Sequence, residues 1–95
     1  MYVVVRRYEG ATDAKEVAKK VNEGLVPLIS QYPGFIAYYG IDSGGGVMTA
    51  IMVFLNQTYA EESAKRAMDW VRQNLTALLP NPPQITAGEV VAYKS

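Results

Sequence analysis

Two adjacent pairs of side chains, Arg6-Arg7 and Tyr38-Tyr39, provide most of the polar chemistry available to this chain. Both pairs fall in segments that are predicted to be β-strands, where neighbouring side chains point to opposite faces. One arginine and one tyrosine therefore face the interior. A buried guanidinium can clamp an anion or an enolate, and a buried tyrosine hydroxyl can orient a substrate oxygen. Arg6, Tyr38 and Tyr39 are therefore the candidate catalytic residues.

Each of these residues also has a purely structural interpretation. A buried arginine needs a carboxylate partner, and Glu89 or Glu9 is placed to form an ion pair with it at the end of the sheet. A buried tyrosine is most often a core residue whose hydroxyl bonds to backbone or water. The residue types alone leave both interpretations open.

Three further residues are candidates for binding a flat, apolar ligand. Trp70 is the one tryptophan of the chain, and it lies beside the apolar stripe of its helix, where it would form one wall of a cleft. Met52 and Phe54, together with Met48, form a polarizable stripe on one face of a strand, which suits an adaptable pocket. The same side chains would also serve in an ordinary core, and Trp70 in a dimer contact.

The composition excludes several kinds of chemistry. The chain has no histidine and no cysteine, so it lacks the commonest general base, the commonest metal ligand and any disulfide or thiolate chemistry. We therefore expect no metal site and no cofactor. Nine basic residues balance nine acidic ones without forming a basic stripe, so we expect no nucleic-acid partner.

The length of 95 residues predicts a single domain that covers residues 1–95. No run approaches the roughly 18 apolar residues that a membrane-spanning helix needs. The first predicted strand begins at Tyr2, which leaves no room for a signal peptide. We therefore expect a cytoplasmic protein that does not associate with membranes.

Hydrophobic periodicity divides the chain into four strands and two helices. The strands are expected at residues 2–8, 35–41, 47–55 and 85–93. The helices are expected to begin at Asp13 and Thr58, each followed three residues later by a glutamate in capping-box spacing. Pro27 should kink the first helix or end its regular part near Leu25. Three glycines in the loop at 42–46 predict a turn with positive φ, because the pattern of a phosphate-binding loop is missing.

The middle of the chain is apolar on both sides of the predicted sheet. Between Gly24 and Ala60 the one charged residue is Asp42, and the strand at 47–55 has a single polar side chain, Thr49. Because side chains alternate along a strand, neither face of this strand is suited to water. Two helices cannot cover both faces, so we expect a second copy of the chain to cover one of them.

The order of elements specifies a known arrangement. Two strand–helix–strand units joined by a hairpin predict an α+β, ferredoxin-like βαββαβ fold with an antiparallel sheet in the order 4-1-3-2. Both helices then lie on one face of the sheet, and the other face is bare within the monomer. This topology agrees with the apolar composition and predicts a homodimer that forms through the open sheet face.

The chain resembles the antibiotic biosynthesis monooxygenase-like proteins of the dimeric α/β-barrel superfamily along its whole length. The likeness is carried by the apolar third strand and by four further segments: Tyr2–Arg6, Val26–Ile29, Tyr32–Phe35 and Gly88–Tyr93. The resemblance implies two sheets packed face to face in a dimeric barrel, with a small-molecule cleft between helices and sheet. It also implies cofactor-independent monooxygenase or isomerase chemistry on a small apolar or aromatic molecule.

The signature residues of two activities in that superfamily are replaced here. Members that oxidise aromatic polyketides carry an asparagine and, four residues later, a tryptophan on the third strand, where this chain has Ala50 and Phe54. Members that degrade haem use a histidine on the second helix, and this chain has none. The alternative function is therefore a non-catalytic dimeric module that binds a ligand or a partner.

Overall fold

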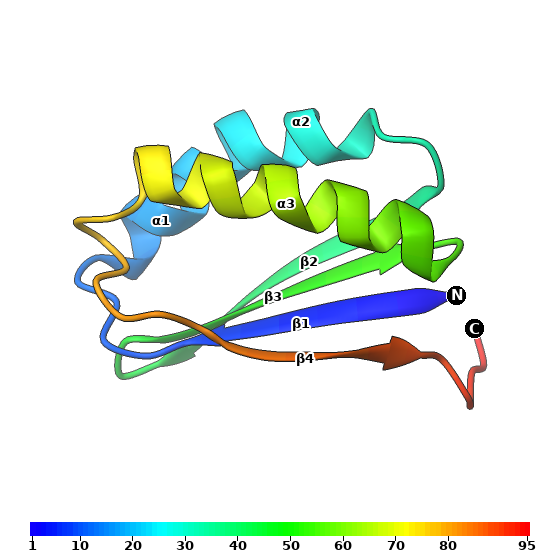
Figure 1. Cartoon of the computed structure of the whole chain (residues 1–95). Coiled ribbons are helices and arrows are strands. Elements are labelled where there is room, and N and C mark those ends of the chain that lie inside the picture. The colour runs from blue at the N-terminus through cyan, green and yellow to red at the C-terminus, as the bar shows by residue number, and fades with distance from the viewer.

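The computed structural model describes residues 1–95 and contains one four-stranded sheet with helices on one side (Figure 1). The elements, in chain order, are β1 (Tyr2–Tyr8), α1 (Ala14–Lys20), the π-helical turn η1 (Val21–Leu25), α2 (Val26–Ser30), β2 (Phe35–Gly44), β3 (Val47–Phe54), α3 (Gln57–Asn74) and β4 (Gln84–Glu89). The strand order is β2-β3-β1-β4, and every neighbouring pair is antiparallel. The predicted ferredoxin-like fold and its strand order are confirmed.

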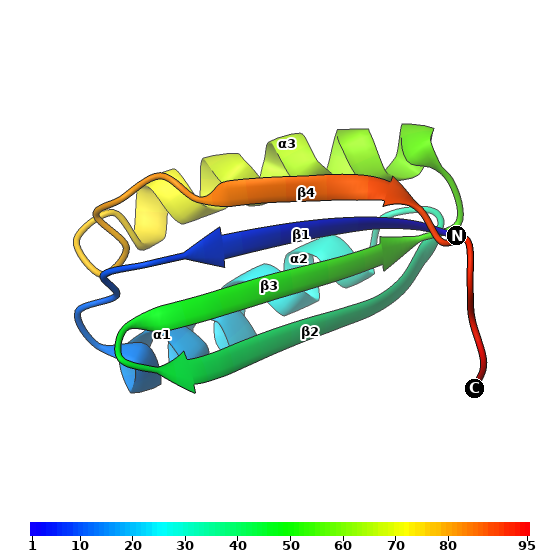
Figure 2. The same cartoon turned by 90° about the horizontal axis from the view of Figure 1, so that it is seen from below.

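The two faces of the sheet differ sharply in how much they are covered. On the helix side Met52 and Phe54 are fully buried. On the other side, which faces the viewer in Figure 2, Tyr39 remains 58% exposed and Ile41 42% exposed. Val3 and Ile51 lie on that same bare side and are only half-buried, because neighbouring side chains of the sheet are all that shields them. The predicted alternation along β3 is therefore present in the structure.

The first helix runs from Ala14 to Ser30 and changes its hydrogen-bond pattern in the middle. Asp13 caps it by accepting a bond from the Glu16 amide at 3.1 Å, as predicted. The amide of Val26 then donates to the carbonyl of Val21, five residues earlier, which is the π-helical spacing. Because Pro27 has no amide hydrogen and crowds the carbonyl four residues before it, the regular pattern breaks at this point. The helix absorbs Pro27 through a π-helical turn and continues to Ser30.

Three predicted boundaries are wrong, and the structure gives a reason for each. Helix α3 is capped by Asn56, whose side chain accepts from the Tyr59 amide at 3.0 Å, and not by Thr58. Strand β2 extends to Gly44 because the hairpin ladder continues to its very end. Strand β4 ends at Glu89 instead of residue 93, because Glu89 pairs with Tyr2, the first residue of β1, and one further bond follows, from the Val90 amide to the Met1 carbonyl at 2.9 Å. As predicted, the glycines at 44–46 have positive φ, between 63° and 81°.

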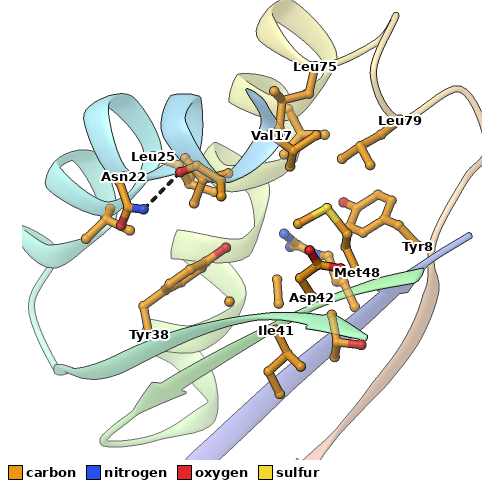
Figure 3. Close-up of a pocket in the computed structure, with 18 of the residues that line it drawn as sticks. Tyr8, Val17, Asn22, Leu25, Tyr38, Ile41, Asp42, Met48, Leu75 and Leu79 are labelled. Atoms are coloured by element: carbon orange, nitrogen blue, oxygen red, sulfur yellow. Dashed lines mark hydrogen bonds between the residues drawn. The ribbon is translucent and has the colours of Figure 1, made fainter. Parts of the chain in front are cut away.

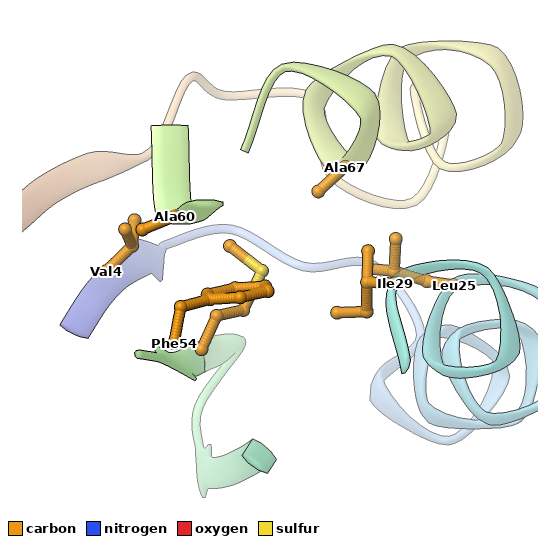
Figure 4. Close-up of a cluster of buried hydrophobic side chains, with 7 residues drawn as sticks. Val4, Leu25, Ile29, Phe54, Ala60 and Ala67 are labelled. Carbon is orange, nitrogen blue, oxygen red and sulfur yellow. The ribbon is translucent and has the colours of Figure 1, made fainter. Parts of the chain in front are cut away.

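The core lies between the sheet and the helices in two clusters. The first gathers side chains from β1, β3, η1, α2 and α3, which converge in Figure 4: Val4, Leu25, Ile29, Met52, Phe54, Ala60 and Ala67. The second lies nearer the β2–β3 turn and contains Tyr8, Val17, Met48, Leu75 and Leu79. Small alanines on α3 let this helix approach the sheet closely at the first cluster. A cavity separates parts of these two clusters and is the candidate site.

Candidate functional site

A cavity of about 250 Å³ lies between the sheet and the first helix. Most of its lining is apolar, and the polar exceptions include Arg6, Tyr8, Asn22, Tyr38 and Asp42. Such a mostly apolar cavity with a few polar groups is the usual form of a small-molecule site. The residues come from three strands, from α1, η1, α2 and α3, and from the connection that follows α3, so the fold as a whole shapes the cavity.

The alternation of β1 and β2 determines which polar groups enter the cavity. Arg6 and Tyr8 are two residues apart on β1, so both point toward the helices. On β2, Tyr38 points the same way. Figure 3 shows Tyr8 and Tyr38 entering from different strands, with their hydroxyl oxygens turned toward the space between them.

The π-helical turn brings a further polar residue to the wall of the cavity. Asn22 lies in η1, and its side-chain amide donates to the carbonyl of Ala18 at 2.9 Å (Figure 3). Val21 and Leu25 of the same turn also line the cavity. The irregular hydrogen bonding that Pro27 imposes is therefore located at the candidate site.

The predicted site residues separate into two groups. Arg6, Tyr38 and Met52 line the cavity together. Phe54 is fully buried in the core, where its ring meets Phe35 edge-on at a centroid distance of 5.8 Å. Tyr39 lies on the bare face of the sheet, away from the cavity.

Trp70 also lies outside the lining of the cavity, although it contacts both core clusters. Its ring lies against Gly24, where a Cβ atom would come within 2.6 Å of it. Glycine at position 24 therefore allows the helices to approach at this point. The tryptophan packs between helices and is not a wall of the cavity.

Arg6 has no carboxylate partner, contrary to the structural interpretation of the sequence. The side chain of Glu9 binds Arg7 instead, and Glu89 faces the N-terminal amino group at 3.8 Å. Arg6 is 3% exposed; its Nη2 donates to the carbonyl of Ala64 at 3.0 Å, and its Nε has no partner. The guanidinium is therefore a buried positive charge that no acidic group neutralises.

Burial also shifts the pKa values of the two tyrosines that line the cavity with Arg6. It raises the pKa of Tyr38 to about 12 and raises the pKa of Tyr8, while the positive charge of Arg6 opposes both shifts. Burial lowers the pKa of Arg6, opposed by Tyr8 and Tyr38. At neutral pH both hydroxyls are therefore protonated and can donate hydrogen bonds. Arg6, Tyr8 and Tyr38 form a set of donors for a ligand oxygen, which we call the donor triad.

The raised pKa of Tyr38 predicts a loss of stability at alkaline pH. Between pH 10 and 12 the unfolded chain releases the Tyr38 proton while the folded chain keeps it, so the free energy of unfolding falls as pH rises. The expected slope from this group is about 1.4 kcal/mol per pH unit. Urea unfolding measured across this range should show a shallower slope for Tyr38→Phe. The exposed Tyr39→Phe variant serves as the control, and an identical slope in both variants would contradict the assignment.

Sequence reasoning missed Tyr8, Asn22 and Asp42 as cavity residues. Tyr8 was within reach of prediction, because it lies two positions after Arg6 on the same strand face. The position of Asn22 depends on the π-helical turn, for which the sequence contained only the indirect signal of Pro27. Asp42 was assigned to a loop, and it lines the cavity because β2 continues past it.

Comparisons with known proteins show the fold. Neither a protein-family model nor a curated protein sequence matches the chain. Solved structures do match, among them the NE2512 protein of unknown function from Nitrosomonas europaea, with 18% identity, a TM-score of 0.80 and coverage of 99% of this chain and 92% of that one. Rv0793 from Mycobacterium tuberculosis has 17% identity, a TM-score of 0.77 and coverage of 99% and 98%.

A third match is a monooxygenase from the gene ActVA-Orf6 of Streptomyces coelicolor, whose structure contains the ligand nanaomycin D. It has 17% identity and a TM-score of 0.74, and the match covers 99% of this chain and 92% of that one. Together with further antibiotic biosynthesis monooxygenase structures, these matches show that the chain has the antibiotic biosynthesis monooxygenase-like fold. No helix of the structure combines the length and the apolar character that crossing a membrane requires.

Proposed function

We propose that the cavity binds a small apolar or aromatic molecule and that the protein acts on it as a cofactor-independent monooxygenase. The observation that carries this proposal is the apolar cavity with the donor triad in its wall. The monooxygenase of the same fold, whose structure contains nanaomycin D, adds support. Binding in a mostly apolar space would exclude water and strengthen each hydrogen bond to the ligand.

The proposed chemistry needs no group that the chain lacks. In the oxidation of an anthrone, the substrate itself supplies four electrons to O2, one oxygen atom becomes the new carbonyl and the other leaves as water. The protein must lower the energy of the enolate that forms when the substrate loses a proton to the solvent. The hydroxyls of Tyr8 and Tyr38 would donate to that developing oxyanion, a role in which fixed donors contribute strongly.

A larger side chain in the wall of the cavity would occupy its space and so test this function. Ala50 lines it on β3, between Arg6 and Gly40 of the neighbouring strands. Wild-type protein incubated with anthrones and quinols under oxygen should form the quinone above the rate in buffer, with matching O2 uptake. The Ala50→Phe variant should lose at least about 90% of this rate, a loss typical of a misplaced substrate.

The control for that variant is Ala77→Phe, the same change at an exposed turn. Quinone formation at the buffer rate would contradict the monooxygenase proposal. If the protein still binds these compounds without converting them, the alternative of a non-catalytic ligand-binding module is correct. Equal rates in Ala50→Phe and wild type would place the reaction outside the cavity.

We also propose that the bare sheet face is covered by a second copy of the chain. Side chains of three adjacent strands make this face mostly apolar: Val3 and Val5 on β1, Val47, Ile51 and Val53 on β3, and Tyr39 and Ile41 on β2. Contiguous apolar patches on small proteins commonly mark interaction sites. A two-fold dimer would bury this self-complementary patch on both copies.

A further inference from the structure

The buried charge of Arg6 has a consequence for the ligand. An isolated charge removed from water is costly unless an opposite charge or several hydrogen bonds compensate it. The structure provides one bond, from Nη2 to the Ala64 carbonyl, and leaves Nε without a partner. The neighbouring tyrosines are neutral at pH 7, so they do not neutralise it either. The site keeps an uncompensated cation beside a mostly apolar cavity.

We infer that the ligand of this cavity is an apolar or aromatic molecule that carries one permanent negative charge, such as a carboxylate, and that Arg6 binds this group. The inference rests on the proposed function, because it takes the same cavity as the binding site. The planar guanidinium is well suited to a carboxylate, to which it donates parallel hydrogen bonds. The hydroxyls of Tyr8 and Tyr38 remain available for a second oxygen of the ligand.

The anion approaches Arg6 from the cavity and not from the opposite side of the strand. Arg6 also lines a shallow groove between α3 and β4, which Glu61 and Asp69 line as well. Lys65 and Arg72 line the groove too and offset those charges, so an anion there meets charges of both signs that water screens, whereas Arg6 is the one cation in the lining of the cavity. The cavity contains one carboxylate, Asp42, whose Oδ1 accepts a hydrogen bond from the Gly44 amide at 2.9 Å.

The position of Asp42 orients the ligand. Asp42 is on β2, which is separated from β1 by β3, so the backbones that carry Asp42 and Arg6 are roughly 10 Å apart across the sheet. A negative group is repelled at the Asp42 end and attracted at the Arg6 end. The apolar body of the ligand then lies along Met48 and Met52. Charge and shape together define one binding direction.

A pair of matched probes tests this inference. Naphthalene-2-carboxylate and naphthalene-2-carboxamide share the same rings and differ in charge. Isothermal titration calorimetry at pH 7 should show that wild-type protein binds the carboxylate about 10- to 100-fold more tightly, the usual range for a hydrogen-bonded charge. The Arg6→Met variant, which keeps the apolar stem, should lose the preference for the carboxylate. The Arg6→Lys variant should retain part of the preference.

Two controls keep the result interpretable. Arg7→Met removes the exposed neighbour that binds Glu9, and it should leave the preference unchanged. Asp42→Asn should tighten binding of the carboxylate about 2- to 5-fold, as expected for one screened charge, without changing binding of the carboxamide. This second effect does not depend on whether Arg6→Met folds.

The possible failures are distinguishable. Equal binding of the two probes to wild-type protein, a preference that survives Arg6→Met, or an unchanged carboxylate affinity in Asp42→Asn would overturn the inference and leave the proposed function intact. If neither probe binds wild-type protein, the cavity is not a site for aromatic molecules. That result overturns the proposed function and the inference together.

Discussion

Replacing Ile51 with aspartate should convert the proposed dimer into a monomer of 10.4 kDa. Ile51 is at the centre of the bare sheet face, paired with Val5 on one side and Tyr39 on the other. In a two-fold dimer both copies would bury the new carboxylate without a partner, at a cost of several kcal/mol for each. The dissociation constant should rise at least about 1,000-fold. Sedimentation velocity at micromolar concentration measures this directly.

The matched control is Ile85→Asp, the same substitution at an isoleucine on the helix side of β4. Ile85 is 56% exposed and lines the groove beside α3, so its replacement should leave the assembly unchanged. A wild-type chain that sediments as a monomer would refute the dimer outright. A dimer that persists in Ile51→Asp would mean that another surface holds the two copies together.

The second large effect is expected at Gly34, in the connection between α2 and β2. Its φ is +78°, and a Cβ atom there would lie 2.3 Å from Cδ2 of Tyr59. Gly34→Ala therefore combines left-handed backbone strain with overpacking against an aromatic ring, and each costs about 1–3 kcal/mol. We expect the free energy of unfolding to fall by about 3–5 kcal/mol, as measured by urea denaturation.

Gly44→Ala separates the two contributions to that loss. Its φ is +81°, but nothing lies within 4 Å of the added methyl group, so it carries the backbone strain alone. The loss should therefore be clearly smaller than at Gly34. Adding Tyr59→Ala to Gly34→Ala should recover part of the difference, because the clash is then removed. Equal losses in the two single variants would show that Tyr59 moves aside without cost.

Most of the fold was predictable because it depends on local periodicity. The two-residue alternation along β3 correctly separated Met52 and Phe54 on one face of the sheet from Ile51 on the other, and the structure shows that the helices cover the first of these faces. The order of strands and helices limited the topology to one common arrangement. The wrong element boundaries depend on which residues pair or hydrogen-bond with the end of each element. Strand β4 ends where Glu89 pairs with Tyr2, with one bond beyond it from Val90 to Met1, and no feature within residues 85–93 signals this.

The candidate site was less predictable because it depends on contacts between distant segments. The sequence required one member of each adjacent pair to face the interior without deciding which, and the structure places Arg6 and Tyr38 there. It did not show that Glu9 and Glu89 bind other groups, so the ion pair with Arg6, one of the two interpretations left open, is absent from the structure. Trp70 and Phe54 are aromatic side chains on the helix side of the sheet, yet both fill core space beside the cavity. The sequence pattern predicted on which side of the sheet these side chains lie, but not which residues they contact.

If an aromatic molecule occupies the cavity between the first helix and the sheet, the four methionines should report it most directly. Met48 and Met52 line the cavity, Met68 lines the groove beside α3, and Met1 is at the N-terminus. With [13C]methyl-methionine protein titrated with naphthalene-2-carboxylate, the methyl resonances of Met48 and Met52 should shift with one common affinity. Those of Met1 and Met68 should remain in place. Unchanged Met48 and Met52 resonances at high probe concentration, or a shift confined to Met68, would contradict the account.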